Sequence, residues 1–364
     1  MKHVLEEIRH NPLLWLLALV PVVLFVQFLT PEAHTLLFLL SVASIVPLAA
    51  LLSRATESVA SKTGDMIGGL LNATLGNLTE LLIALTALRA GQYILVKASI
   101  VGAIVTNALF MLGASFLLGG FKYHVQEYNR SAARLQAGLL FLATIAMLIP
   151  SLLAESDAAS TNPTFTQSLS VGLSILLIIT YALGLVFSLK THRELFASED
   201  HGEEGDSEWP LRLALVTLAA VTVLVALVSE VFVESVQQAA IALGITPAFV
   251  GVIIVALVGG AAEMVSAFSA ARKNKLDLSV GIALGSAVQI ALFIAPVLVL
   301  LSYVIGPTPM DLQFWRGAVA MTLIAAITAS LVTNSGRSAW FLGALVVTVY
   351  VIFGMTLYLL PPRT

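Results

Sequence analysis

Long apolar runs separated by short polar segments form the main pattern along the chain. The run at 341–360 has the length, about 20 residues, that a helix needs to cross the hydrocarbon core of a membrane. Because these runs are continuous and do not alternate with polar residues, they favour helices over the strands of a β-barrel. The pattern predicts eleven membrane spans, near 13–30, 35–52, 64–88, 93–119, 132–153, 166–189, 210–231, 245–271, 277–305, 312–333 and 338–360.

The composition supports an all-α integral membrane protein. Of the 364 residues, 59% are hydrophobic and 11% are charged, whereas an ordinary globular protein carries about 25% charged residues. A soluble fold of this composition would leave too much apolar surface in water. The first run ends at Thr30-Pro31-Glu32 without a small-residue cleavage site, so we interpret it as a retained span and not as a signal peptide.

The basic residues predict how the spans are oriented. With the N-terminus in the cytoplasm, fourteen of the 18 Lys and Arg residues fall in cytoplasmic segments. The other four are Arg89, Lys97, Arg316 and Arg363. A wrong number of spans would scramble this asymmetry, which therefore supports eleven spans and places the C-terminus outside. The short stretch before the first span favours the inner membrane of a prokaryote.

The segment 191–209 is the one clearly water-soluble stretch, with seven of the 21 acidic residues of the chain. It is either a solvated linker between two halves or a cytoplasmic segment that attracts cations near a pore mouth. Its central acids are Glu199, Asp200, Glu203 and Glu204. No basic run indicates nucleic-acid binding, and the absence of cysteine excludes disulfides and thiolate metal sites.

Two segments of the chain repeat each other. The first is Gly76-Asn-Leu-Thr-Glu80, and Asn107 follows it in the next span. The second is Gly259-Gly-Ala-Ala-Glu263, and Gln289 follows it at almost the same spacing. Each half therefore has a glutamate in one span and a carboxamide in the next.

The number of spans in each half predicts that the two repeats are inverted. Five spans follow the first one, and five more follow the acidic segment, so an odd number inserts the halves upside down relative to each other. We predict a first span with the start of repeat one (1–54), a five-helix repeat (35–190), the acidic cytoplasmic loop (191–209) and a second five-helix repeat (210–364). Inverted repeats place a substrate site near the middle of the membrane.

Glu80 and Glu263 are the main candidates for chemistry, because each lies inside an apolar stretch. An ionised side chain at the bilayer centre costs about 2.5–3.5 kcal/mol on insertion scales, so it normally faces a cavity or a partner. A single acid could simply stay protonated and buried. Two acids at matching places in inverted halves favour a shared site.

Carboxylate and amide oxygens suit a hard divalent cation such as Ca²⁺, which takes 6–8 oxygen ligands. Asn77 lies three residues before Glu80, on the same face of a helix. Asn107 and Gln289 can add amide oxygens to this metal site, although a hydrogen bond between helices would also explain them.

Three glycines next to the acids predict loosened helices. Gly76, Gly259 and Gly260 can free backbone carbonyls to face an ion, although packing of small residues would also explain them. The two acids can also hold protons, since two close carboxylates cannot both stay ionised without a cation. A site that holds either Ca²⁺ or protons is an exchanger in principle, working by alternating access.

These motifs resemble the calcium/proton exchanger family of the cation/calcium exchanger superfamily. The similarity runs from about residue 64 to the end of the chain. It rests on Gly76 through Gly113 with Leu85-Thr-Ala-Leu-Arg89, Gly259 through Leu300 with Arg272-Lys-Asn-Lys-Leu-Asp277 and Gly285-Ser-Ala-Val-Gln-Ile-Ala-Leu-Phe293, Gly69-Leu-Leu-Asn-Ala-Thr74, and Phe187-Ser-Leu-Lys-Thr-His-Arg-Glu-Leu-Phe196.

The resemblance implies eleven spans with the last ten as two inverted repeats, and it implies that Glu80 and Glu263 bind the ion beside Asn107 and Gln289. It also implies that the acidic loop is a cytoplasmic regulatory or gating element. The second motif departs from the family pattern, with Gly260, Met264 and Ala256 where Asn, His and Pro are usual. The second half therefore offers fewer side-chain ligands.

We thus expect a Ca²⁺/H⁺ antiporter in the lipid bilayer that needs no cofactor beyond the transported ions and is not an enzyme. A sodium/calcium exchanger of the same fold should offer more hydroxyl groups beside its acids, whereas here only Thr79 directly precedes one. Another divalent ion such as Mn²⁺, a passive channel, and a scaffold or enzyme without transport remain alternatives. The sequence carries no ATP-binding P-loop and no HExxH protease motif. It leaves the oligomeric state open.

Overall fold

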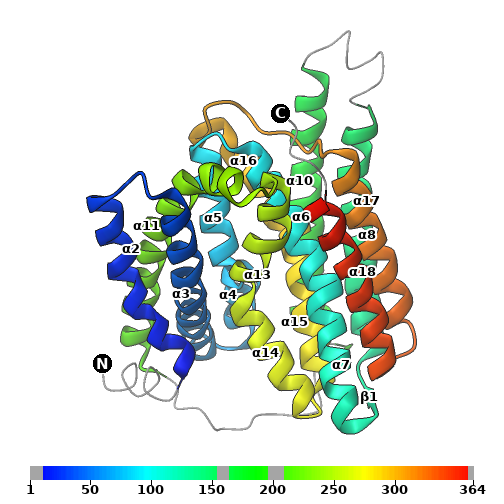
Figure 1. Cartoon of the computed structure of the whole chain (residues 1–364). Coiled ribbons are helices and arrows are strands. Elements are labelled where there is room, and N and C mark those ends of the chain that lie inside the picture. Colours follow the sequence, from blue (N-terminus) through cyan, green and yellow to red (C-terminus); the bar gives the residue numbers. More distant parts are fainter. Residues whose placement is uncertain (1–10, 154–163, 196–208, 360–364) are drawn as a thin grey trace.

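The computed structural model describes residues 11–153, 164–195 and 209–359. Within these residues, nine helices are long and apolar enough to cross a membrane, and two bent helix pairs bring the number to eleven. The eleven predicted spans are thereby confirmed. The chain runs between the lower and the upper end of the molecule in Figure 1, and we use these two ends as reference directions.

The first half of the chain contains a peripheral helix and five further spans. Its elements are η1 (Pro12–Ala18) with α2 (Leu19–Leu29), α3 (His34–Lys62), α4 (Asp65–Leu75) with α5 (Leu78–Arg89), α6 (Tyr93–Val105) with η2 (Thr106–Met111) and α7 (Leu112–Tyr123), β1 (Val125–Glu127), α8 (Arg130–Leu153), α10 (Phe165–Val186) with η3 (Phe187–Thr191), and η4 (Arg193–Leu195).

The second half repeats the order of the five spans, although its strand lies between the fourth and fifth spans and not between the third and fourth. It contains α11 (Leu211–Leu243), α12 (Pro247–Phe249) with η5 (Val250–Val255), α13 (Ala256–Gly259) and α14 (Ala261–Arg272), α15 (Leu276–Gln289) with η6 (Ile290–Ile294) and α16 (Ala295–Ile305), α17 (Arg316–Thr333), β2 (Arg337–Ala339) and α18 (Trp340–Leu359). In both halves the second span is a bent pair, with bends of 41° and 59°. The residue limits predicted for the repeats stay a prediction.

Two spans are longer than the sequence pattern predicted. The spans near 35–52 and 210–231 correspond to helices His34–Lys62 and Leu211–Leu243. These two helices pack against each other, which stabilises turns whose own composition is too polar for a membrane span. The second helix ends at Gly244, whose left-handed backbone (φ 68°, ψ 25°) suits a residue without a side chain.

The start of one predicted span was wrong. The span near 312–333 begins only at Arg316, because residues 306–315 form an extended segment across the upper ends of the helices. Buried and partly exposed residues alternate along 310–315. This period of two residues is typical of an extended chain and not of a helix. The apolar residues Met310, Leu312 and Phe314 made this segment look like the beginning of a helix.

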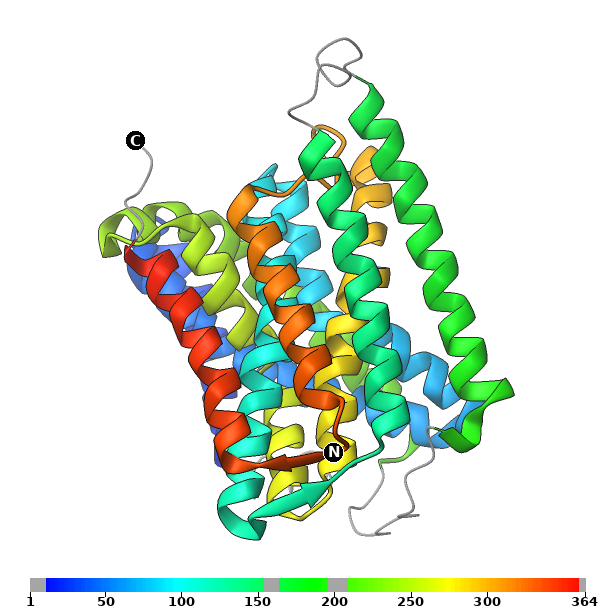
Figure 2. The same ribbon diagram turned by 90° about the vertical axis from the view of Figure 1, so that its right-hand side faces the viewer.

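A two-stranded sheet at the lower end adds to the helical architecture. Strands β1 and β2 lie side by side in antiparallel order, as Figure 2 shows. Gln126 lies opposite Ser338 in this pairing. Glu127 and Arg337 form an exposed ion pair across the strands, with 2.7 Å between Oε1 and Nη2. Three-residue strands lie below the length that a sequence pattern can reveal, so this sheet was not predicted.

Candidate cation-binding site

The two candidate acids occupy matching places in the fold. Glu80 lies in the first turn of α5, directly after the bend that follows α4, and Glu263 lies in the first turn of α14, directly after the bend that follows α13. The first turn of a helix carries partial positive charge, which stabilises a carboxylate there. Broken helices that aim their ends at the middle of the membrane are typical of ion sites in transporters.

The structure also brings the two acids together. A Cβ atom on Gly259 would lie 3.0 Å from Cγ and 3.3 Å from Cδ of Glu80, so the end of α13 contacts the Glu80 side chain. Glu263 lies four residues after Gly259, in the first turn of the helix that follows this contact. The sequence predicted each acid in a different span. In the structure the two bent pairs cross, and the crossing brings the acids close together.

A chain of hydrogen bonds, which we call the amide relay, connects the predicted carboxamides. The Asn107 Nδ2 donates to the Ser286 Oγ at 2.7 Å, and this hydroxyl donates to the Asn77 Oδ1 at 2.7 Å. Asn77 in turn donates from Nδ2 to the Gln289 Oε1 at 2.9 Å. All four side chains are at least 95% buried, and the relay joins the first half of the chain to the second.

The relay leaves specific polar atoms unpaired. Within the described residues, the Asn107 Oδ1, the Gln289 Nε2 and the Glu263 Oε2 are buried and have no hydrogen-bond partner. Buried polar atoms are normally paired, so such atoms in one place indicate a site that a ligand or ordered water completes.

The position of Asn77 corrects one detail of the prediction. It was expected on the same helical face as Glu80, but it lies in the bend before α5, with a non-helical backbone (φ −102°, ψ 36°). The bend turns its side chain towards Gln289, which is why Asn77 takes part in the relay.

The predicted glycines lie at the two bends. Gly76 ends α4, where a Cβ would lie 2.7 Å from the Asn72 carbonyl oxygen and 3.4 Å from the Gln289 Oε1. Gly260 separates α13 from α14, and a Cβ there would lie 3.6 Å from the Asn107 Oδ1. Both glycines therefore allow the bent backbone to come close to the amides of the relay.

A cavity of about 540 Å³ reaches this site from the lower end of the molecule. Its lining includes Glu57 of α3 and Asp277 at the start of α15, which lie towards the lower end. Its lining also includes Glu263, Ser286 and Gln289, which belong to the site. The cavity therefore extends from residues near the lower end of the helices to residues of the site.

Sequence reasoning missed two of these residues. Ser286 lies three residues before Gln289 in an apolar run, and its polar side chain on the same helical face was the available signal. Glu57 follows the predicted span 35–52 and lies within α3, whose length the sequence pattern underestimated. The predicted loop acids Glu199, Asp200, Glu203 and Glu204 lie outside the described residues.

The donor set decides which ions the site can hold. Among the described residues, no group of three or more His, Cys, Asp or Glu side chains could hold a metal ion. A cation bound between Glu80 and Glu263 therefore needs amide, backbone carbonyl or water oxygens as well. Hard divalent cations such as Ca²⁺ accept such a mixed oxygen shell.

Comparison with known proteins identifies close relatives along most of the chain. The family model described as sodium/calcium exchanger protein matches residues 33–190 and 213–359. A Ca(2+)/H(+) antiporter of Aphanothece halophytica is 39% identical over 339 residues, which cover 89% of this chain and 90% of that protein. The Ca(2+)/H(+) antiporter ChaA of Bacillus subtilis (strain 168) is 41% identical over 328 residues, with coverages of 89% and 92%.

Solved structures with the same fold include both kinds of exchanger. The structure of native YfkE is 36% identical, with a TM-score of 0.83 over 96% of this chain and 100% of that one. The H+/Ca2+ exchanger CAX is 16% identical with a TM-score of 0.73, over 95% and 91% of the two chains. The sodium-calcium exchanger NCX_Mj is 17% identical with a TM-score of 0.53, over 90% and 98%. The last two show the fold alone.

Proposed function

Because the chain belongs to the sodium/calcium exchanger protein family, we propose that this multi-pass membrane protein exchanges Ca²⁺ for H⁺ across the membrane. The observation that carries the proposal is the meeting of Glu80 and Glu263, each in the first turn of the helix after a bend, with Glu263 lining the cavity. The relatives named Ca(2+)/H(+) antiporter, at 39% and 41% identity, favour protons over sodium as the coupling ion.

The two glutamates are the residues for which Ca²⁺ and protons compete. With Ca²⁺ between them, both carboxylates are ionised and balance the charge of the ion. Without it, two close carboxylates in a poorly hydrated place cannot both stay charged, so at least one binds a proton. Binding of one substrate therefore excludes the other, which is the condition for exchange.

The amide relay supplies the remaining side-chain ligands of the proposed site. The Asn107 Oδ1 is unpaired and needs no rearrangement to face an ion. The oxygens of Asn77 and Gln289 accept hydrogen bonds within the relay, so at least part of the relay must rearrange before they contact Ca²⁺. The bends at Gly76, Gly259 and Gly260 add candidate backbone carbonyls.

The cavity and the basic residues together suggest how the protein is oriented. The cavity opens at the lower end, and the loops at this end hold most of the basic residues, which favours the cytoplasmic side. The N-terminus then lies in the cytoplasm and the C-terminus outside, and the described conformation faces inward. We place the protein in the inner membrane of a prokaryote, with the acidic loop 191–209 as a cytoplasmic regulatory or gating segment.

Transport in liposomes tests this function. The purified protein is reconstituted, a pH gradient is imposed, and internal Ca²⁺ is followed with a dye. We expect Ca²⁺ to accumulate against its own gradient only while the pH gradient exists. Glu80→Gln and Glu263→Gln should each abolish this uptake, because Gln keeps the shape of Glu but cannot balance the ion. Glu230→Gln changes an exposed acid of α11 and serves as the matched control.

Three other outcomes would contradict parts of the proposal. Ca²⁺ that only runs downhill, whatever the pH, would indicate a passive channel. Uptake driven by a sodium gradient instead of protons would indicate the sodium-coupled alternative. Full uptake by both site variants would remove the two glutamates from the mechanism.

A further inference from the structure

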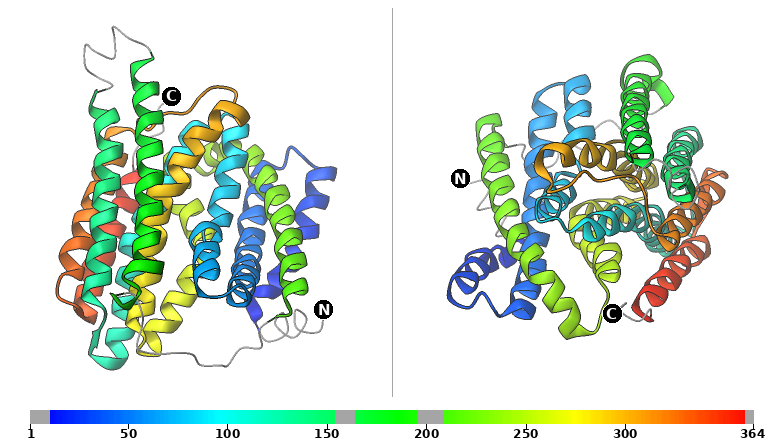
Figure 3. Two further views of the ribbon diagram at one scale, coloured as in Figure 1. Left: turned by 180° about the vertical axis from the view of Figure 1, so that it is seen from behind. Right: turned by 90° about the horizontal axis from the view of Figure 1, so that it is seen from above.

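The extended segment 306–315, which we call the strap, crosses the upper ends of the helices on its way from α16 to α17 (Figure 3). Met310, Leu312 and Phe314 point into the molecule and are at most 6% exposed. The helices α16 and α17 are not packed against each other, so the strap has to cross the ends of the helices between them, and it buries three large apolar side chains at alternate positions as it does so. The strap is therefore packed onto the helix ends as a layer of its own.

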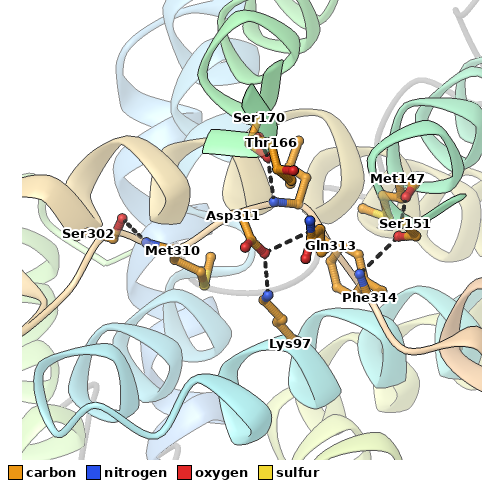
Figure 4. Close-up of polar contacts among 11 residues, drawn as sticks. Lys97, Met147, Ser151, Thr166, Ser170, Ser302, Met310, Asp311, Gln313 and Phe314 are labelled. Atoms are coloured by element: carbon orange, nitrogen blue, oxygen red, sulfur yellow. Dashed lines mark hydrogen bonds and ion pairs between the residues drawn. The ribbon is translucent and has the colours of Figure 1, made fainter. Parts of the chain in front are cut away.

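Hydroxyl groups from three helices hold the backbone of the strap in place (Figure 4). Ser302 of α16 accepts from the Met310 N–H at 2.7 Å, Ser170 of α10 from the Leu312 N–H at 3.0 Å, and Ser151 of α8 from the Phe314 N–H at 2.9 Å. These buried N–H groups would otherwise be unpaired in a place with little water. The strap thus depends on the present arrangement of all three helix ends.

An ion pair connects the strap to the first half of the chain. Lys97 of α6 and Asp311 of the strap approach to 2.5 Å between Nζ and Oδ1, with side chains that are 18% and 27% exposed. Figure 4 shows the lysine reaching upward from α6 to the strap. One turn away on α6, the hydroxyl of Tyr93 donates to the carbonyl oxygen of Thr308 at 2.5 Å and accepts from its N–H at 2.9 Å.

A third contact at this end involves α11. Gln92, in the turn before α6, donates from Nε2 to the carbonyl oxygen of Val233 at 2.7 Å. All of these contacts join the first half to the second, and all lie at the end opposite to the opening of the cavity. We call Gln92, Tyr93, Lys97 and their partners Val233, Thr308 and Asp311 the outer latch.

The latch acts on the helices that carry the site. Asn107 lies ten residues after Lys97 along α6 and η2, which corresponds to about 15 Å of helix. Ser286 and Gln289 lie in α15, which continues through η6 into α16, where the strap begins. The latch therefore clamps the upper ends of the two site-bearing helices together, while the cavity opens the way to the same site from below.

We propose that the strap is the outer gate of the transporter and that the Lys97–Asp311 pair fastens it while the cavity is open at the opposite end. Opening the site to the outside separates the pair and lifts Met310 and Leu312 from the helix ends. This inference rests on the proposed function, since a gate needs a transport path, but its first test does not depend on transport.

Thiol labelling tests the release of the strap. The chain has no cysteine, so a single Met310→Cys substitution gives one buried reporter. Lys97→Met removes the charge, and Asp311→Asn removes the charge but keeps an acceptor for the Gln313 N–H. We expect either substitution to raise the labelling rate of the reporter about twofold to fivefold, because the loss of an ion pair near the surface changes an equilibrium constant by about this factor.

Two variants decide whether the charge pair causes this change. The exchange Lys97→Asp with Asp311→Lys restores the pair and should return the labelling rate towards that of the native latch. Arg89→Met removes an exposed charge at the end of α5 and should leave the rate unchanged. A labelling rate that does not change when the pair is removed would contradict the proposal that the Lys97–Asp311 pair fastens the strap.

Cross-linking tests whether the strap must move. A protein with Lys97→Cys and Asp311→Cys is joined by a short bifunctional thiol reagent with a reducible arm and then reconstituted. We expect Ca²⁺/H⁺ exchange to stop and to return after reduction, with each single variant as control. If the cross-linked protein exchanged Ca²⁺ for H⁺ at the normal rate, the proposal that the strap is the outer gate would be wrong. If the unmodified protein itself transported no Ca²⁺, the proposed function would fail, while the labelling result would still stand.

Discussion

At the residue scale, the chemistry depends on which atoms of the site are already paired. Ser286 is the central member of the amide relay, because it accepts from Asn107 and donates to Asn77. Glu80 instead has a glycine as its neighbour, since Gly259 leaves room for its carboxylate. The Ser286 hydroxyl thus positions the amides of the relay, and the space at Gly259 accommodates the side chain of Glu80.

Replacing Ser286 with Ala should destabilise the protein. The change leaves the Asn107 Nδ2 and the Asn77 Oδ1 without this partner in a buried place, which costs about 1–3 kcal/mol. Thermal unfolding in detergent measures the effect as a lower Tm. Ser266→Ala removes an exposed hydroxyl that lines the same cavity and should change the stability by less than about 0.5 kcal/mol. Equal effects of both substitutions would argue against the relay.

Replacing Gly259 with Ala should weaken Ca²⁺ binding. The new Cβ would lie 3.0 Å from Cγ of Glu80, so the carboxylate must move by a few tenths of an ångström. We expect the apparent affinity for Ca²⁺ to fall about tenfold, which corresponds to about 1.4 kcal/mol. The concentration dependence of uptake measures it. Gly281→Ala is the control, because a Cβ there meets no atom within 4 Å, and an unchanged affinity in Gly259→Ala would contradict the assignment.

At the scale of elements, the bent pair of the second half packs closely against α6 of the first half. Helix α6 crosses η5 at Gly102 and Gly251, where each glycine faces the backbone of the other segment. Such close crossings need residues without side chains, as is common between membrane helices. The crossing sets the distance between the halves and thereby the distance between the two acids.

Replacing Gly251 with Ala should disturb this crossing. A Cβ at this position would lie 2.4 Å from the Cβ of Ala98, which is far too close for two carbon atoms. We expect a loss of stability of about 1–3 kcal/mol, measured by thermal unfolding, because one of the helices must shift. Gly138→Ala in α8 meets nothing within 4 Å and should stabilise its helix by up to about 1 kcal/mol. A stabilised Gly251→Ala protein would show that the crossing is looser than described.

At the scale of the whole molecule, the two ends differ although the two halves share one order of spans. The lower end holds the opening of the cavity and the β1–β2 sheet, and the upper end is covered by the strap. An exchanger that works by alternating access must be able to reverse this difference. Under the proposed function, the described structure is one of these two states.

Sided labelling tests the orientation of this state. Gly281 lines the cavity and has space for a side chain, so Gly281→Cys adds a reporter without a clash. We expect a membrane-impermeant thiol reagent to label it in inside-out vesicles and not in right-side-out vesicles. Saturating Ca²⁺ should slow the labelling if the ion reaches the site through this cavity. Labelling from the outside alone would reverse the proposed orientation.

The sequence determined much of this protein by itself. Continuous apolar runs predict the spans, because lipid leaves no other place for so many apolar residues and no partner for backbone groups outside a helix. The matching Gly76-to-Glu80 and Gly259-to-Glu263 segments made both acids the candidates for ion binding, since ionisable residues are costly in a membrane. The repeat also predicted that the acids belong to one site.

Only the tertiary structure decided how the amides, the strap and the cavity are arranged. Asn77 and Gln289 are far apart in the sequence and meet only because α15 of the second half passes beside the bend between α4 and α5. Leu312 and its neighbours look like the start of a span until the hydroxyls of three other helices hold them in an extended strap. Hydropathy measures whether a residue prefers lipid or protein to water, but it does not say which neighbours bury it.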